Sequence, residues 1–458
     1  MLILAILVSK VITKFLRLTK SGGGTALPGL IALKIEPKLV EKLAKQFKKG
    51  SIIVTGTNGK TTTVKIIADA LKQEGKSVLY NSSGSNLLRG IAATLAERSS
   101  LTGRLPYEYG LFEVDEASVP AAARQLDPKL ILVLNLFRDQ LDRYGELDKT
   151  AELIGNAIRN HPEAKVILNA DDPLVASLAR YTKNVIYFGI DNSNVAVKTP
   201  ETFSDSGNCV FCGNVLNYDI CYFGHMGKYV CPAGDFKRPT PHIEALDVTL
   251  KGLEGQNLEI KAQGQQLTLT AAIPGLYNSY NILGAFSAAL VTETGLDAFK
   301  RALDQFETAF GRMEKVSYRG RYLYLLLIKN PMGFNQVINT FNIAEDKKTL
   351  MIAINDKFAD GRDVSWLWDV EFEALRGSSR RIMISGSRAY DMALRLKYAD
   401  ITAEKVMTEL DLPLALEKTI DKTEEKETIF IMPTYTAMFA LRKYLSEKVK
   451  LKNFWETG

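Results

Sequence analysis

The sequence predicts an α/β protein with two units, each built around a parallel sheet. Short β-branched runs alternate with helical stretches from Ser51 onward, and the same alternation begins again after Gly311. Between about Pro200 and Gly275 the composition changes, with many Gly, Asn and Tyr residues and with all four cysteines of the chain. Alternating strands and helices are typical of parallel sheets that helices cover on both faces. The middle section is therefore expected to be a small β insertion followed by antiparallel strands.

Length and composition exclude several classes of protein. The chain has 458 residues, enough for several domains of about 100 to 200 residues each. Hydrophobic residues make up 46% and charged residues 24%, a balance that allows large cores and excludes disordered, collagen-like and coiled-coil proteins. Lys and Arg total 58 against 52 Asp and Glu, so the net charge is +6. So small an excess permits an anionic partner but does not argue for nucleic acid.

The N-terminal segment combines an apolar start with basic residues. Eight apolar residues open the chain, and Lys10, Lys14, Arg17 and Lys20 follow. The apolar run is shorter than the roughly 20 residues that span a bilayer. It also lacks the charge before the run and the cleavage site after it that a signal peptide carries. Two interpretations stay open: an amphipathic helix packed on the protein's own core, or one lying on a membrane face.

The other elements follow the two-unit scheme in order. Gly22 to Gly24 break the first helix, so residues 1–37 are expected as a helix and a glycine-rich linker. The central unit is expected over 38–310, with its insertion at about 200–245, and the C-terminal unit over 311–458. Helices are predicted at Thr62–Gly75 and Arg89–Glu97, and strands at Ser51–Gly56, Ser77–Asn81, Tyr109–Glu116, Leu130–Leu136, Lys165–Ala170, Leu258–Ala262, Leu267–Ile273, Tyr322–Ile328, Thr349–Ile354, Arg381–Ser385 and Thr428–Met432.

The strongest chemical signal is the segment SIIVTGTNGKTTTVKIIADAL, in which a strand ends at a glycine-rich turn and a helix begins. Such a turn directs backbone N–H groups and a helix N-terminus at one spot, where phosphate binds. The lysine would neutralise β/γ-phosphate charge, and the hydroxyl of Thr61 would ligate Mg²⁺. Val54 stands where the strict Walker pattern has its first glycine, but Lys60 and Thr61 follow Gly59 in the required order. The expected nucleotide-binding residues are Gly56, Thr57, Asn58, Gly59, Lys60, Thr61 and Thr62.

This turn resembles the P-loop of the Mur ligase superfamily, which includes the folylpolyglutamate synthetases. Four further stretches match the superfamily in the expected order: Asn135–Glu146, with Gln140 in place of the usual His, Asn169–Asp172, Gly275–Asn281 and Gly311–Glu314. The resemblance covers the chain from about Gly22 to its end. It implies a Mur ligase central P-loop ATPase domain with an inserted zinc-ribbon-like element, followed by a C-terminal Rossmann-like α/β domain.

The resemblance also implies roles for residues outside the P-loop. Glu113 would bind Mg²⁺ together with Thr61, and Asn278 would approach the adenine. Members of the superfamily phosphorylate a carboxylate with ATP, and an amine then attacks the acyl phosphate. Several negative charges therefore lie close together and must be surrounded by cations and oriented N–H groups. Lys60, Mg²⁺ and Arg312 would supply that field, and Arg312 lies beyond a hinge, so the domains are expected to close around ATP.

Two departures distinguish the chain from the amino-acid-adding members. Those enzymes carry Asp-Tyr-Ala-His-x-Pro in the C-terminal domain, whereas here Leu326 takes the place of the Asp and Lys329 that of the His. Those enzymes also have a large N-terminal domain for the UDP part of their substrate, whereas here the P-loop strand begins at Ser51. The cysteine cluster and four further stretches instead resemble the MurT family of ligase subunits, namely Gly22–Gly29, Lys329–Val337, Asn355–Glu373 and Met432–Met438.

The MurT resemblance implies ATP-dependent amidation of the α-carboxylate of D-glutamate in the lipid II stem peptide, a step of peptidoglycan synthesis. Ammonia would come from glutamine hydrolysed by a separate, GatD-type glutaminase subunit. A membrane-bound substrate needs no UDP-binding domain, and it favours a cytoplasmic protein that docks peripherally at the inner membrane face.

In this family an Asp of the ligase subunit is expected to orient the catalytic His of the glutaminase. An ionised carboxylate fixes the tautomer of an imidazole and supports the imidazolium that forms when a thiol loses its proton. Asp356 is the expected residue, with Asp360 in reserve and Asp363 as a third carboxylate of the same segment. A solvated acidic loop without this role stays open as an alternative.

The four cysteines are too few for a disulfide framework, and their spacing is typical of a structural zinc site. Cys209-x-x-Cys212-Gly forms one knuckle, but Cys231-Pro232-Ala233 is followed by Gly234 where a second knuckle would have its cysteine. The fourth ligand is therefore open, and loss of the site is the alternative. The expected zinc ligands are Cys209, Cys212 and Cys231, with Cys221 or His225 as the fourth.

Two other functions stay open. An amino-acid-adding ligase of the Mur or folylpolyglutamate type would use ATP, a soluble carboxylate and an amine, without a partner. A non-enzymatic, nucleotide-gated zinc-ribbon protein would bind nucleic acid. For the main hypothesis the expected cofactors are ATP, Mg²⁺ and Zn²⁺, and the expected partners are the glutaminase subunit and lipid II.

Overall fold

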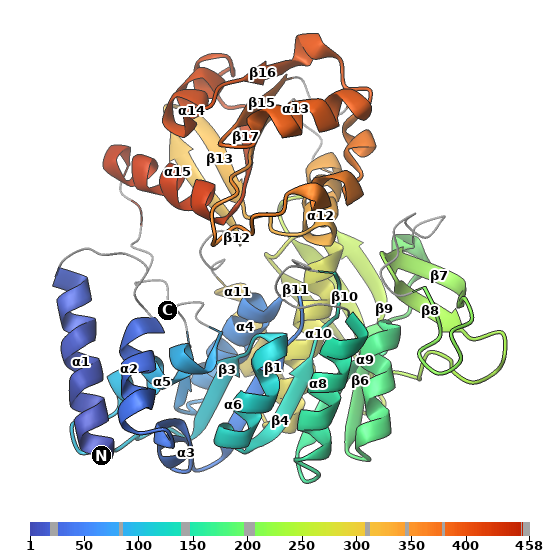
Figure 1. Cartoon of the computed structure of the whole chain (residues 1–458). Coiled ribbons are helices and arrows are strands. Elements are labelled where there is room, and N and C mark those ends of the chain that lie inside the picture. Colours follow the sequence, from blue (N-terminus) through green and yellow to red (C-terminus); the bar gives the residue numbers. More distant parts are fainter. Residues whose placement is uncertain are drawn as a thin grey trace.

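The computed structural model describes residues 1–18, 26–81, 86–138, 147–196, 207–306, 312–343, 348–377, 381–449 and 451. Two sheet-based units lie one above the other, with the C-terminal unit, in orange and red, above the central unit (Figure 1). A small hairpin, labelled β7 and β8, projects from one side of the central unit.

The central unit is built on a nine-stranded sheet with the order β11-β10-β9-β6-β5-β4-β1-β3-β2. Its strands are β1 (Gly50–Thr55), β2 (Val78–Tyr80), β3 (Tyr109–Glu113), β4 (Pro128–Val133), β5 (Lys165–Asn169), β6 (Val185–Ile190), β9 (Ile243–Leu250), β10 (Gln256–Ala262) and β11 (Gln265–Ala271). Neighbouring strands from β2 to β9 run parallel. The β9-β10-β11 edge is antiparallel.

Both faces of this sheet are apolar because side chains alternate along each strand. In β1, Ile52 and Val54 join the core on one face, and Ile53 joins the core on the other. The first face is covered by α4 (Lys60–Gln73), α10 (Leu276–Val291) and α11 (Leu296–Asp304). The second face is covered by α1 (Leu2–Leu18), α2 (Leu27–Ile35), α3 (Leu39–Ala44), α5 (Leu88–Arg98), α6 (Val119–Leu126), α8 (Leu147–Arg159) and α9 (Pro173–Ser177).

The C-terminal unit is built on a six-stranded sheet with the order β12-β13-β17-β14-β15-β16. Its strands are β12 (Arg312–Tyr318), β13 (Arg321–Leu326), β14 (Lys348–Ala353), β15 (Arg381–Ser385), β16 (Val406–Thr408) and β17 (Thr428–Pro433). Only β12 is antiparallel to its neighbour. Its helices are α12 (Pro331–Ile343) and α13 (Ala389–Tyr398) on one face, and α14 (Leu412–Asp421) and α15 (Tyr435–Lys448) on the other.

The structure confirms the α/β class and a strand in every segment where one is predicted. It adds β6, β9, β12 and β16, together with a two-stranded antiparallel hairpin, β7 (Asn217–Phe223) and β8 (Met226–Val230). The hairpin falls within the expected insertion, and Tyr222, Phe223 and Met226 pack into the first core of the central sheet. Its turn is thereby held against the central unit, close to the carboxyl ends of the parallel strands.

Candidate active site

Two glycines shape the turn between β1 and α4. Gly56 has a φ of +130° and Gly59 a φ of +90°, values that residues with a Cβ atom rarely adopt. A Cβ on Gly56 would lie 2.8 Å from the carbonyl oxygen of Asn135, and a Cβ on Gly59 would lie 1.9 Å from Oδ1 of Asn281. Both positions thus require glycine, and α4 begins at Lys60 with its N-terminus at the turn. This is the geometry of a phosphate-binding loop.

Asn135 fixes the conformation of the turn. Its Oδ1 accepts from the backbone N–H of Asn58 at 2.9 Å, and its Nδ2 donates to the Asn58 carbonyl at 3.0 Å. The hydroxyl of Thr57 donates to the Phe137 carbonyl at 3.1 Å and accepts from the Phe137 N–H at 3.0 Å. The start of the predicted Asn135–Glu146 stretch therefore braces the turn. Gln140 and the rest of that stretch, 139–146, lie outside the described residues.

The ammonium group of Lys60 is held at the turn by an acid that the sequence analysis misses. Lys60 is buried, and its Nζ lies 3.1 Å from Oε2 of Glu116. The same Nζ donates to the carbonyl oxygens of Gly56 and Thr57. Burying a charge is costly unless it is paired, so Glu116 stabilises the lysine in place. The sequence offers one hint of this role, since Glu116 is the second acid after the LFEV run and lies three residues beyond Glu113.

Thr61 and Glu113 meet as the sequence predicts. The Thr61 hydroxyl donates to Oε2 of Glu113 at 2.8 Å. Asn81 braces the backbone of Glu113 with two hydrogen bonds of 2.9 Å, one to its carbonyl and one from its N–H. A hydroxyl and a carboxylate are oxygen donors of the kind that Mg²⁺ prefers. These two side chains therefore fit the expected cation.

A cleft lies beside the turn, between the two units, and residues of both units line it. The central unit contributes Asn58, Gly59, Tyr277 and Asn278 to its wall, and the C-terminal unit contributes Met313, Lys329, Met332 and Gly333. Asn278 donates to the Pro274 carbonyl at 2.7 Å and accepts from Nδ2 of Asn281 at 2.8 Å. This amide pair positions both asparagines at the start of α10. A mostly apolar cleft with a few oriented polar groups suits a nucleobase.

The C-terminal unit contacts the phosphate-binding turn directly. Asn330 donates from Nδ2 to Oδ1 of Asn58 at 3.2 Å, and its own Oδ1 accepts from the Gly333 N–H at 2.7 Å. Asn330 follows Lys329 in the LLIKNP stretch, which departs from the amino-acid-adding ligases. Arg312 begins β12, but its side chain lies outside the described residues. Its role toward ATP stays a prediction.

The loop after β14 separates the three candidate carboxylates. Asp356 is partly exposed, accepts from the Ser387 hydroxyl at 2.8 Å and pairs with Nε of Arg388 at 2.8 Å. The hydrogen bond from Ser387, together with the Arg388 charge, holds the pKa of Asp356 below its ordinary value despite partial burial. Asp356 is therefore an ionised and partly exposed carboxylate.

The other two acids of this loop accept hydrogen bonds that tie down the chain, Asp360 from the start of α15 and Asp363 within the loop. Asp360 is buried and accepts from the N–H and the hydroxyl of Thr436, each at 2.6 Å. Asp363 accepts from the Ser365 N–H at 2.8 Å at the start of a short helical turn. Asp356 is instead paired with Arg388, and its role toward a partner stays a prediction.

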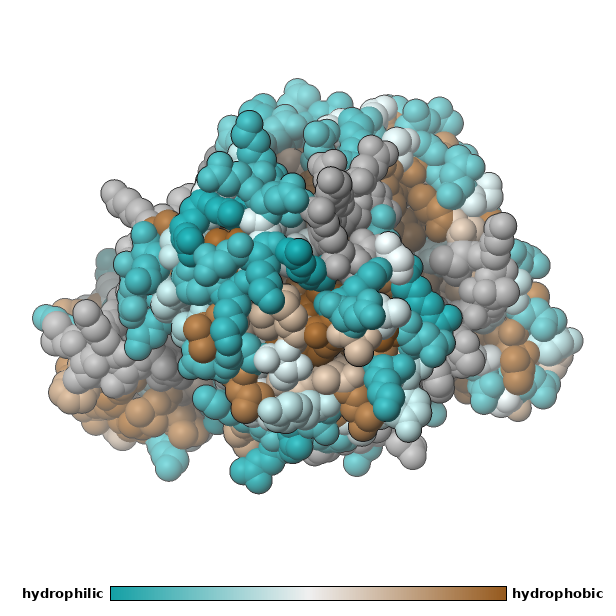
Figure 2. All heavy atoms as spheres, turned by 90° about the horizontal axis from the view of Figure 1, so that it is seen from above, coloured by the Kyte–Doolittle hydropathy of each residue, from teal (hydrophilic) through white to brown (hydrophobic). Residues whose placement is uncertain are grey.

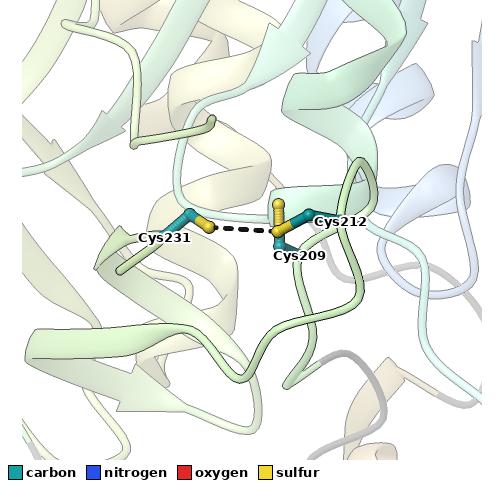
Figure 3. Close-up of side chains that lie close together, drawn as sticks. All are labelled: Cys209, Cys212 and Cys231. Atoms are coloured by element: carbon teal, nitrogen blue, oxygen red, sulfur yellow. Dashed lines mark hydrogen bonds between the residues drawn. The ribbon is translucent and has the colours of Figure 1, made fainter. Parts of the chain in front are cut away.

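Three of the four cysteines converge beside the hairpin (Figure 3). The thiols of Cys209, Cys212 and Cys231 lie within 4.8 Å of one another, and the Cys212 and Cys231 sulfurs are 3.4 Å apart. The backbone N–H of Asn214 lowers the pKa of Cys212, but hydrogen bonds with the Asp235 carboxylate and the other two thiols raise it to about 12. Three thiols at this spacing fit a tetrahedral zinc ion.

The structure does not bring the two expected fourth ligands to these thiols. Cys221 is buried in β7, and its Sγ lies 3.4 Å from the Gly224 carbonyl. The hairpin register pairs Cys221 with Gly227 near the turn, whereas Cys231 follows the opposite end of β8. His225 is buried against the Phe137 ring, with Nε2 3.3 Å from Asp172. The expectation of Cys221 or His225 as the fourth ligand of this cluster is therefore corrected, because among the described residues the three thiols form the group by themselves.

The chain is similar to known ligase subunits over almost its whole length. Residues 54–229 match the family model of the Mur ligase middle domain, and residues 327–438 match that of the MurT ligase C-terminal domain. The MurT subunit of lipid II isoglutaminyl synthase (glutamine-hydrolyzing) from Streptococcus pneumoniae is 34% identical, over 94% of this chain and 94% of that one. The chain belongs to the MurT family. The Staphylococcus aureus MurT subunit is 31% identical over 92% of this chain and 93% of its own length.

Solved structures place the MurT-family chain in the Mur ligase fold. A pseudomurein peptide ligase type C from Methanothermus fervidus has a TM-score of 0.69 and 24% identity, covering 92% of this chain and 84% of that one. The MurF ligase of Thermotoga maritima, in a complex with ADP, has a TM-score of 0.64 and 15% identity, covering 91% and 85%. Because both identities are below 25%, these likenesses show the fold alone.

The predicted Asn169–Asp172 stretch of the MurT-family chain makes several buried hydrogen bonds. Asp172 caps α9 by accepting from the N–H groups of Leu174 and Val175, and it also accepts from the Leu136 N–H at 2.8 Å. Asn169 donates to the Leu134 carbonyl at 2.9 Å. The Asn169–Asp172 stretch thus ties the ends of strands β4 and β5 together.

Within the described residues, no helix has the length and apolar character needed to cross a membrane.

Proposed function

We propose that this chain is the ATP-dependent ligase subunit of a lipid II isoglutaminyl synthase. It amidates the α-carboxylate of D-glutamate in the lipid II stem peptide through an acyl phosphate. The observation that carries the proposal is the juxtaposition of Lys60, Thr61 and Glu113 at a phosphate-binding turn, in a chain that matches MurT subunits over almost its whole length.

The proposed roles follow from the contacts at the turn. Backbone N–H groups at the start of α4 and the Lys60 ammonium hold the phosphates of ATP. Thr61 and Glu113 would hold Mg²⁺, and the ion would supply positive charge beside the transferred phosphoryl group. Asn278 and the apolar cleft hold the base. The chain's own groups thus keep the terminal phosphate at one point, where the D-glutamate carboxylate attacks it.

Ammonia completes the reaction, and we propose that a glutaminase subunit supplies it. The curated relatives are named as subunits of a glutamine-hydrolyzing synthase. Asp356 is ionised and partly exposed, and it lies at the carboxyl end of β14, where open α/β sheets bind ligands. Phe358, two residues beyond Asp356, and Tyr390, two residues beyond its ion-pair partner Arg388, are 77% and 69% exposed. These observations support a docking face at which Asp356 orients the catalytic histidine of a GatD-type partner.

A structural zinc ion and a membrane location complete the proposal. Cys209, Cys212 and Cys231 would bind zinc as three of its four ligands, and the resulting zinc-ribbon-like insertion would be rigid. The protein would work in the cytoplasm at the inner face of the membrane, because its substrate is anchored there.

The decisive experiment is reconstitution. The chain and a GatD-type glutaminase are mixed with lipid II, ATP, Mg²⁺ and glutamine, and the product is analysed by mass spectrometry. We expect conversion of one carboxylic acid to an amide, with ammonium replacing glutamine when the glutaminase is left out. Addition of an amino acid to a soluble UDP-linked precursor, or nucleotide-gated binding of nucleic acid without any amidation, would instead favour one of the two other functions.

A further inference from the structure

Helix α1 carries apolar side chains on two opposite faces. Ala5, Ile6 and Ser9 are fully buried on the face toward the protein, where Ala5 and Ile6 belong to the core shared with α2 and α5. The other face is exposed, with Leu4 at 49% and Val11 at 67% of their surface accessible. Positions 3, 4, 7 and 11 lie along one stripe of a helix. The exposed apolar residues of this stripe are Ile3, Leu4, Leu7 and Val11.

Helix α2 extends the same surface. Its Leu27 and Leu30 are 44% and 38% exposed, while Pro28 and Gly29 are buried beneath them. A Cβ on Gly29 would lie 1.8 Å from the carbonyl oxygen of Arg89, so α2 sits in close contact with α5. Apolar side chains gather at the left edge of the molecule in Figure 2, where α1 and α2 lie in Figure 1. The patch is therefore mounted on a well-packed part of the central unit.

The charge of this region has one sign. The first 35 residues contain Lys10, Lys14, Arg17, Lys20 and Lys34 and no Asp or Glu, although acids nearly balance bases over the whole chain. Lys14 is exposed and lies one turn beyond Val11, and Lys34 is exposed near the end of α2. An apolar stripe bordered by lysines and free of acids is the composition of helices that lie in the interface of an anionic membrane.

We propose that α1 and α2 form a membrane-docking surface, with the stripe of Ile3, Leu4, Leu7 and Val11 inserted among the lipids of an anionic bilayer. The inference rests on the proposed function, because a lipid-anchored substrate must be met at the bilayer. A second copy of the chain is a poorer occupant, since two surfaces that carry only positive charge would repel each other. The glutaminase is also a poorer occupant, because the surface proposed for it lies on the C-terminal unit at Asp356.

Vesicle flotation tests the proposal with the full-length chain. Vesicles of phosphatidylcholine alone are compared with vesicles that also contain phosphatidylglycerol. We expect flotation with the anionic vesicles, and we expect it to weaken as salt screens the lysines. The double variant Leu4→Gln/Leu7→Gln should lose binding by about 10- to 100-fold, because two apolar side chains no longer leave water. Lys14→Gln should weaken binding by about fivefold.

The matched control is Leu410→Gln/Leu414→Gln on the C-terminal unit, where the two leucines are 48% and 46% exposed. This control should float like the wild type. Equal binding by wild type and Leu4→Gln/Leu7→Gln would overturn the proposal. So would a wild-type dimer, or a complex with the glutaminase, that the same double variant abolishes in sedimentation, because the stripe would then be a protein interface.

A second readout keeps this inference separate from the proposed function. Leu4→Gln/Leu7→Gln should amidate a short-chain, water-soluble lipid II analogue at the wild-type rate, but amidate lipid II in vesicles at least tenfold more slowly. If the wild type amidates the analogue but ignores anionic vesicles, only the docking surface is wrong. If the wild type amidates neither substrate, the proposed function itself fails.

Discussion

Lys60 illustrates how a cation is kept ready for phosphate inside a protein. Its Nζ is buried, yet it lies 3.1 Å from the Glu116 carboxylate and donates to carbonyl oxygens of the turn. Glu116 therefore offsets the cost of burying the ammonium group. A nucleotide brings a stronger negative charge to the same end of α4, so its phosphates would compete with Glu116 for Lys60.

Replacing Lys60 tests its role at the phosphates. Lys60→Ala should lower the rate of ATP-dependent amidation by about 100- to 1000-fold, because it removes a cation from the transferred phosphoryl group. Lys72→Ala, at an exposed position on the same helix, is the matched control and should keep the rate. Initial rates at saturating lipid II and glutamine measure both variants. If both variants react equally fast, Lys60 does not contact the nucleotide.

Replacing Asp356 should affect the glutamine-driven reaction but not the ligase reaction itself. Asp356→Asn should lower glutamine-driven amidation by about 1000-fold or more, the range seen when a carboxylate that orients a catalytic histidine is lost. Amidation driven by added ammonium should be unchanged, since the ligase site lies elsewhere. Asp363→Asn, in the same loop, should leave both reactions intact. An equal loss of both reactions in Asp356→Asn would point to damage of the C-terminal unit instead.

The pH dependence follows from the sign of the Asp356 shift. The Ser387 hydrogen bond and the Arg388 charge set the pKa of Asp356 below its ordinary value of 3.8, so the group stays ionised as the pH falls through the neutral and mildly acidic range. Its contribution to stability is present above its unfolded pKa and is lost only as the pH falls through its folded pKa. The acid limb of glutamine-driven amidation should therefore lie near pH 6 to 7, where a partner histidine titrates. An acid limb near pH 4 would contradict this assignment.

At the scale of elements, α4 is bounded by two glycines that differ in their surroundings. Gly59 and Gly75 both have positive φ, at +90° and +77°, but only Gly59 has a neighbour within 4 Å of an added Cβ. Gly59→Ala should thus combine backbone strain with a clash against Asn281, whereas Gly75→Ala should bring strain alone, of about 1 kcal/mol.

Urea unfolding and ATP binding distinguish the two glycine variants. Gly59→Ala should lower the free energy of unfolding by more than Gly75→Ala does, and it should also abolish measurable ATP binding. Gly75→Ala should bind ATP as the wild type does, because it lies at the far end of α4. Equal ATP affinities for the two variants would show that the turn before α4 does not hold the nucleotide.

The hairpin insertion gives a prediction about metal content. Cys209→Ser and Cys231→Ser should each lose zinc and lower the Tm, because structural zinc contributes directly to folding. Cys221→Ser is the control and should retain zinc, because its sulfur lies by the Gly224 carbonyl. Metal analysis of the purified variants checks this, and zinc loss in Cys221→Ser alone would reverse the ligand assignment.

At the scale of the whole molecule, the candidate nucleotide site lies between the central and C-terminal units. Asn58 and Asn330 are 272 residues apart in the chain and share a hydrogen bond at the cleft. Lys329 and Met332 line the same cleft from the C-terminal side. Movement of one unit against the other would therefore open or complete the nucleotide site, as expected for ligases that close around ATP.

Local sequence predicts the elements well where each segment carries its own signal. The β-branched run before Gly56 and the order Gly59-Lys60-Thr61 predict a strand, a turn and a helix, and the structure has them. The contact between Thr61 and Glu113 was expected only from the family resemblance. Their separation of 52 residues in the sequence says nothing about the distance between the two side chains. The boundary expected at residues 310/311 stays a prediction, since 307–311 lie outside the described residues.

Contacts that depend on sheet topology could not be predicted from the sequence. The pairing of Lys60 with Glu116 depends on β3 lying beside β1 in the sheet, and the Asn58–Asn330 contact depends on how the two units pack. Cys221 was misassigned for a similar reason. Composition places it with the other cysteines, but the hairpin register carries it to the turn, at the opposite end from Cys231.

Isotope transfer tests the central claim most directly. Lipid II labelled with ¹⁸O in the α-carboxylate of D-glutamate is incubated with the chain, the glutaminase, ATP and glutamine, and the released phosphate is analysed by mass spectrometry. Passage through an acyl phosphate predicts one ¹⁸O in the phosphate for each amide formed. Unlabelled phosphate alongside full amidation would contradict the account, because the oxygen would then leave without ever having been joined to phosphorus.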